Sequence, residues 1–118
     1  MSVISEIFDT IANAMRQFIE MVKGMVKTIV TTIVSYKNQV VNWFKNLHLI
    51  KGRHIPFIGQ RDDFRTMLKN APTKNIGIFE GVYDEITKEI SNLQYIAADQ
   101  IDIQTKQVLG KEPIVVLE

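Results

Sequence analysis

Few residues of this chain have the types and spacing that catalysis or metal binding requires. His48 and His54 lie six residues apart, with no carboxylate or third ligand at the spacing of a metal site. Asp62 and Asp63 could hold a metal or transfer protons, but arginines flank them, and this pattern favours a helix N-terminus with local ion pairs. The chain has no cysteine, no glycine-rich phosphate loop and no nucleophile elbow. We therefore expect no enzyme, no cofactor, no metal and no small-molecule substrate.

Basic residues concentrate in the middle of the chain. Segment 45–74 has a net charge of +5, against +1 for residues 1–44 and −5 for residues 75–118. Aromatic residues are interleaved with these charges, a pattern found on nucleic-acid-binding faces. Alternatively, the basic residues pair with the acidic last third or are simply solvated. The residues available to contact an anion or a nucleic acid are Lys51, Arg53, Arg61, Arg65 and Lys69.

The first part of the chain shows helical spacing. Apolar residues recur at steps of three and four, which predicts one long amphipathic, coiled-coil-like helix over residues 1–48. Unbroken, it would be about 65–70 Å long, whereas a compact domain of this size has a radius of gyration of only about 13–14 Å. Its apolar seam is therefore expected to bind partner chains, unless Gly24 breaks the helix into a hairpin. The expected interface residues are Ile4, Phe8, Ile11, Met15, Phe18, Val22, Val26, Ile29, Ile33, Tyr36, Val40, Trp43 and Leu47.

Residues 21–36, MVKGMVKTIVTTIVSY, admit three interpretations. A membrane span needs about 20 apolar residues, and lysines interrupt this stretch too often. A strand suits its β-branched composition. The apolar pairs at 29–30 and 33–34, however, repeat every four residues, which is helical spacing. We therefore expect this stretch to be the middle of the long helix.

The second part, residues 49–118, is expected to form a single structural unit with the helix. A Gly/Pro connector covers 48–60 and a short helix 61–70, while 73–81 reads as either a strand or a loop. A second, acidic helix is expected over about 82–98. It would continue to Leu109, with Gly110 following its end, or residues 99–117 would instead form a small hairpin in which IDIQTKQVL pairs with PIVVLE. The apolar tail favours a strand. The expected fold class is mainly α.

These features favour a structural or assembly protein. It would self-associate, or act as a small subunit of a multi-subunit particle such as a virion, through its long helix. A peripheral membrane-binding module is one alternative, because the helix is amphipathic. A nucleic-acid-binding module, using segment 45–74, is a second. The start of the chain lacks the pattern of a secretory signal, and with no transmembrane helix expected, the location would be intracellular or within a particle.

Overall fold

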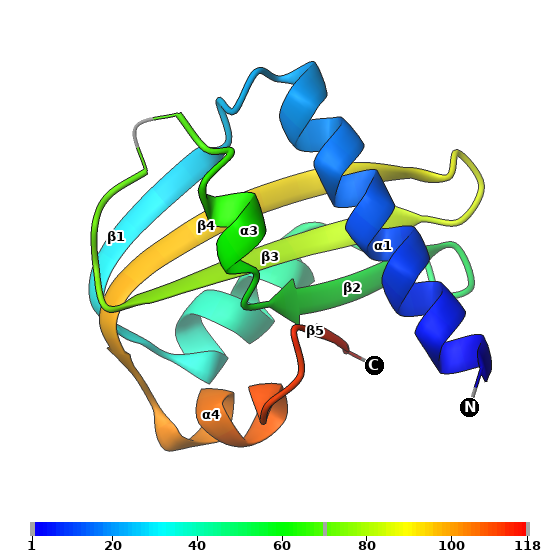
Figure 1. Cartoon of the computed structure of the whole chain (residues 1–118). Helices are drawn as coiled ribbons and strands as arrows, with labels where there is room; N and C mark the ends of the chain where they lie inside the picture. The colour runs from blue at the N-terminus through cyan, green and yellow to red at the C-terminus, as the bar shows by residue number, and fades with distance from the viewer. Residues whose placement is uncertain (1, 70, 118) are drawn as a thin grey trace.

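A five-stranded mixed sheet forms the centre of the computed structural model (Figure 1). The structure describes residues 2–69 and 71–117, with side chains from residue 7 onward. The strand order is β1-β4-β3-β2-β5. The elements in chain order are α1 (Ser2–Met21), β1 (Lys27–Val34), the π-helix η1 (Tyr36–Val41), α2 (Asn42–Asn46), β2 (His54–Gly59), α3 (Asp62–Arg65), β3 (Ile76–Asp84), β4 (Glu89–Ile101), α4 (Ile103–Leu109) and β5 (Ile114–Val116).

The middle of the sheet is an antiparallel meander of β2, β3 and β4. β5 adds to β2 antiparallel, and β1 adds to β4 in parallel from the other side. The two edges are therefore an eight-residue strand, β1, and a three-residue strand, β5.

Helices cover both faces of the sheet. α1 and α3 lie on one face, in front in Figure 1, and η1 and α2 lie behind the sheet. Alternate residues of one strand reach the two cores, so that Phe57 joins the α1 core and Ile58 the η1–α2 core. Likewise, Tyr95 joins the α1 core while Ile96 joins the other. Each apolar core is thus built from strand side chains on one side and helical side chains on the other.

The prediction of a mainly α fold with one long N-terminal helix is wrong. Residues 1–48 contain α1, β1, η1 and α2, and the turn after α1 has left-handed backbone at Lys23 and Gly24. The molecule extends 35 × 31 × 28 Å, about half the length that the unbroken helix would need. The helical spacing in β1 does not mark a buried helix face, because Val34 is the only buried residue of the strand and Val30 and Ile33 are exposed. The β-branched composition, which favours a strand, was the better guide to this stretch.

The predicted acidic helix over 82–98 is also wrong. That stretch holds the end of β3, a turn, and most of β4, with Tyr83 paired opposite Ile90. The Asp84 carboxylate accepts hydrogen bonds from the amides of Ile86 and Thr87, which fixes the turn locally. Helical spacing arose by coincidence, because both faces of this hairpin are buried and apolar residues need not alternate there.

Other sequence expectations agree better with the structure. A short helix, α3, lies inside the range 61–70, and the connector ends in β2. The ambiguous segment 73–81 is mostly strand β3. The expected continuation of the acidic helix to Leu109 is wrong, because β4 runs to Ile101, but the separate helix α4 does end at Leu109 with Gly110 following it. The apolar tail forms strand β5.

Candidate functional site

The outer side of β1 is the longer of the two open edges of the sheet. β1 pairs with β4 alone, and its sequence KTIVTTIV carries no charge after Lys27. Val30 is 55% exposed and Ile33 is 42% exposed. Proteins usually protect sheet edges with charges, prolines, bulges or short strands. β5 at the other edge is only three residues long and follows Pro113, whereas β1 is eight residues long and has no charge or proline after Lys27.

One hydrogen bond shows which main-chain groups of β1 point away from the sheet. The amide of Asp102, just beyond β4, donates to the carbonyl of Val34 at 3.0 Å. Main-chain groups of a strand point alternately to its two sides. The even-numbered residues of β1 therefore face β4, and residues 27, 29, 31 and 33 present their amide and carbonyl groups to the open side.

The second feature is a cleft of about 950 Å³ between α2, the loop after it, β2 and the C-terminal tail. Its apolar lining is Val41, Phe44, Leu49, Ile50, Pro56 and Leu117. The other lining residues are two lysines, two histidines and a glycine, namely Lys45, Lys51, His48, His54 and Gly52. No carboxylate lines it within the described part of the chain.

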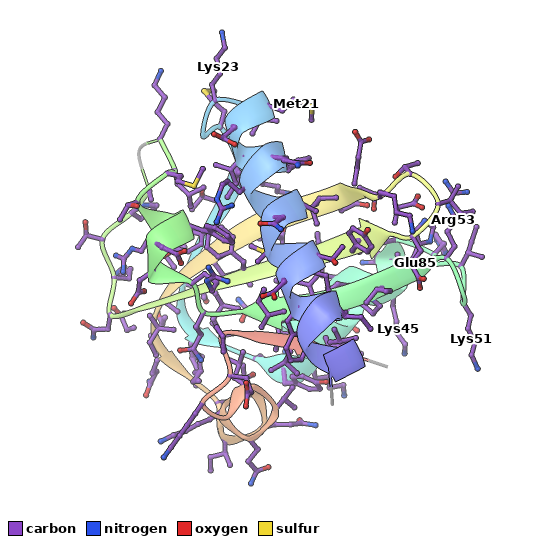
Figure 2. All side chains as sticks on the ribbon, turned by 45° about the vertical axis from the view of Figure 1, so that its right-hand side comes forward. Met21, Lys23, Lys45, Lys51, Arg53 and Glu85 are labelled. Carbon is purple, nitrogen blue, oxygen red and sulfur yellow. The ribbon has the colours of Figure 1, made fainter. Side chains whose placement is uncertain are left out.

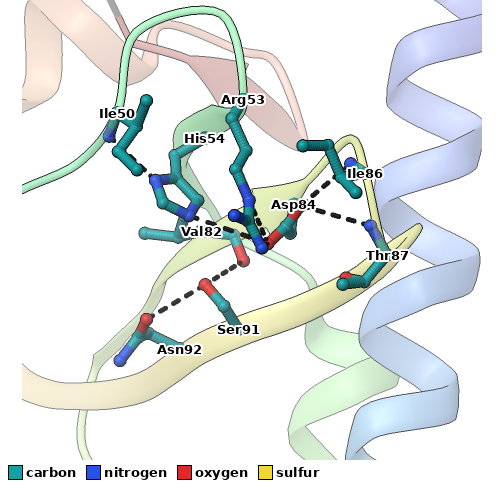
Figure 3. A network of polar contacts seen from close by, with 9 residues as sticks. All are labelled: Ile50, Arg53, His54, Val82, Asp84, Ile86, Thr87, Ser91 and Asn92. Carbon is teal, nitrogen blue, oxygen red and sulfur yellow. Dashed lines mark hydrogen bonds and ion pairs between the residues drawn. The ribbon is translucent and has the colours of Figure 1, made fainter.

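A polar network holds the loop beside this cleft (Figure 3). The Arg53 guanidinium donates to one carboxylate oxygen of Asp84 through Nε at 3.0 Å and Nη2 at 2.9 Å. The Ile50 amide donates to Nδ1 of His54, while Nε2 of His54 lies 3.7 Å from the same Asp84 oxygen. The hydrogen bond from Arg53, with the amides of Ile86 and Thr87, lowers the pKa of Asp84 to about 2. Asp84 is therefore a fixed anion that anchors Arg53.

The structure separates the five expected anion contacts. Lys51 and Arg53 lie near the cleft, and Arg61, Arg65 and Lys69 lie in or beside α3. Arg61 makes a bidentate pair with Asp63, which confirms the local ion pairing expected around α3.

Among the described residues, Arg53 pairs with Asp84 and Lys74 with Asp99, so the basic middle and the acidic last third meet within the chain. Anion or nucleic-acid binding by the five residues stays a prediction.

The thirteen expected interface residues do not form one seam. Phe8, Ile11, Met15, Phe18 and Val26 belong to the α1 core. Ile29, Tyr36, Val40, Trp43 and Leu47 belong to the core on the opposite face of the sheet. Ile33 lies exposed on β1, Val22 is partly exposed at the end of α1, and the side chain of Ile4 lies outside the described residues. Their role between chains stays a prediction.

Sequence reasoning missed a buried acid–amide pair. Glu80 on β3 and Gln94 on β4 lie opposite each other in register, 0% and 2% exposed, and the Gln94 amide donates to Glu80 at 2.5 Å. Burial raises the pKa of Glu80 to about 7, against the opposing effect of the Gln94 hydrogen bond. The second oxygen of Glu80 and the amide oxygen of Gln94 have no partner among the described residues. Glu80 lies in segment 73–81, which the sequence left open between a strand and a loop, so nothing in the sequence indicated this burial.

The described residues contain neither a membrane-spanning helix nor a metal-binding cluster. Helices there are too short or too polar to cross a membrane, and histidine and carboxylate side chains nowhere gather in the groups of three or more that a metal ion needs. No known protein family, curated protein or solved structure matches the chain.

Proposed function

We propose that this chain is an assembly subunit that self-associates through the open edge of β1. The observation that carries the proposal is an eight-residue, β-branched edge strand whose single charge lies at its first residue. The occupant that fits this edge is a second copy of the same strand. This contact replaces the long helix as the means of association.

The β1 sequence is complementary to itself in the antiparallel direction. Pairing centred on Thr31 sets Ile29 opposite Ile33, and sets Lys27 of each copy near Ser35 of the other. The two lysines then lie at opposite ends, so like charges do not meet. Parallel pairing in register would place them side by side. The outward main-chain groups of residues 29, 31 and 33 match this register, which gives a two-fold, isologous interface and one continuous sheet.

The test is the mass of the purified chain, measured by light scattering after gel filtration at several micromolar concentrations. We expect twice the 13.5 kDa of one chain. Thr31→Pro removes an outward amide without touching the β1–β4 ladder, and should give a folded monomer. Thr31→Val keeps the amide and the branched side chain, and should stay dimeric.

A charge variant gives a second, independent arm. Ile33→Lys places a lysine opposite Ile29 of the other copy and should abolish the dimer. Ile86→Lys is the matched control, because Ile86 is 69% exposed and lies in the turn between β3 and β4, outside the part of β4 that pairs with β1. A wild-type chain that is monomeric throughout, or a Thr31→Pro chain that stays dimeric, would contradict the proposal.

The peripheral-membrane and nucleic-acid alternatives stay predictions, as does the expectation that the chain is not an enzyme. Neither alternative gains a specific observation to match the β1 edge.

A further inference from the structure

The cleft beside α2 combines an apolar interior with basic groups at its mouth. Six of its lining residues are aliphatic, aromatic or proline, and its volume of about 950 Å³ falls in the range of small-molecule sites. Lys45 and Lys51 belong to its lining, and neither has a carboxylate partner among the described residues. Figure 2 shows both side chains on the same side of the molecule.

Nearby charges leave these lysines available to a ligand. Asp84 does not line the cleft, and its carboxylate is occupied by Arg53 and by the amides of Ile86 and Thr87. Arg53 is correspondingly committed to Asp84, as Figure 3 shows. Among the described residues that line the cleft, the charges of Lys45 and Lys51 therefore have no acidic counterpart, and they lie next to an apolar surface.

The lip of the cleft is held in place before any ligand arrives. The Ile50 carbonyl accepts from the amides of Arg53 and His54, and the Ile50 amide donates back to the His54 ring. Left-handed backbone at His48 and Gly52 brackets this loop. Ile50 is nevertheless 55% exposed, so an aliphatic side chain is fixed at the opening with part of its surface in water. A preorganised lip loses little entropy on binding.

We propose that this cleft binds a long-chain fatty acid, with the acyl chain along Phe44, Leu49 and Leu117 and the carboxylate between Lys45 and Lys51. An acyl chain matches the apolar lining, and a single anionic head matches a mouth whose described residues include cations and no acid. The site is separate from the proposed β1 interface, because the cleft borders β2 and the tail, whereas β1 is the opposite edge of the sheet.

The test is calorimetric titration of the full chain with oleate below its micelle concentration. Fluorescence of Trp43, the only tryptophan, gives a second signal, since its ring lies 4.9 Å from that of Phe44 in the cleft wall. We expect saturable binding of one oleate per chain. Oleyl alcohol, which lacks the charge, and octanoate, which lacks most of the chain, should each bind at least about tenfold more weakly.

Paired lysine variants locate the site. Lys45→Gln with Lys51→Gln should weaken oleate binding about tenfold or more, whereas Lys106→Gln with Lys111→Gln, the same change of charge away from the cleft, should leave it unchanged. Ile33→Lys should bind oleate as the wild type does, which separates this inference from the proposed dimer.

Four results would overturn the inference. These are an absence of oleate binding, equal binding of oleate and oleyl alcohol, equal losses in the two double variants, and binding to anionic vesicles or to DNA without binding of oleate.

Discussion

The two faces of the sheet are buried to a similar degree but differ in what they bury. The α1 face carries an apolar core with two buried tyrosines, Tyr83 and Tyr95, and the Tyr95 hydroxyl has no partner among the described residues. The η1–α2 face holds the ionisable Glu80, hydrogen-bonded to the amide of Gln94, and its helices also form a wall of the cleft. Apolar packing favours one tight arrangement, whereas buried polar groups and open clefts lower stability. The α1 face is thus built for stability, and the other face carries the groups whose free energy depends on pH or on a ligand.

The largest expected effect comes from Glu80. Its pKa is about 7 in the folded chain against an ordinary 4.5, so the folded state holds a proton that the unfolded state releases between these values. The free energy of unfolding should therefore be highest below about pH 4.5 and fall by about 3 kcal/mol as the pH rises through 7. Urea unfolding across this range in the wild type and in Glu80→Gln measures the effect. In Glu80→Gln, the free energy of unfolding should decrease much less over this pH range, so that above pH 7 the variant is more stable than the wild type.

Glu89→Gln is the matched control, since Glu89 is exposed on the same hairpin. It should follow the wild-type profile. Asp84 does not interfere, because a pKa lowered to about 2 contributes stability that is lost only as the pH falls below the ordinary value of 3.8. If the free energy of unfolding changed with pH equally in the wild type and in Glu80→Gln, the η1–α2 face would not be the source of the pH dependence.

The next effect compares two glycines on the two faces. Gly24, φ +76°, turns the chain from α1 into β1, and a Cβ there would lie 2.5 Å from the Met67 carbonyl oxygen. Gly52, φ +87°, lies in the cleft loop with open space around it. Both alanine variants should be destabilised by about 1 kcal/mol or more through backbone strain. Gly24→Ala should lose a further ~1–2 kcal/mol through overpacking. Equal losses in urea unfolding would show that the α1 side is no more tightly packed at this point.

Gly24 also shows how far the sequence leads. In the middle of a helix, Gly24→Ala would stabilise the chain, whereas the left-handed backbone that Gly24 adopts makes the same substitution destabilising. Helical spacing correctly identified α1, where one face is buried and one is solvated. The same spacing failed at β1 and β4, because pairing between distant strands overrode the local period.

The candidate sites were only partly visible in the sequence. Lys51 stood out by its charge, but the apolar residues that share the cleft with it come from α2, β2 and the tail, which no sequence spacing relates. Ile29 and Ile33 were expected to be buried between chains, and they remain in the proposed interface as residues of a strand rather than of a helix. The burial of Glu80 depends on strand register, which a single sequence does not specify.

The smallest effect concerns the hydroxyl of Tyr95, on the α1 face. Its ring is buried against Phe79, and its oxygen has no hydrogen-bond partner among the described residues. An unpaired buried hydroxyl destabilises the folded state, so Tyr95→Phe should raise the free energy of unfolding by up to about 1 kcal/mol at every pH. Tyr83→Phe, on the neighbouring strand, leaves that hydroxyl in place and should not stabilise the chain. Glu80→Gln gains stability only where Glu80 would ionise, whereas Tyr95→Phe should gain it equally at pH 5 and pH 8. A Tyr95→Phe gain that varied with pH, or a loss, would mean that the α1 face also depends on a polar contact.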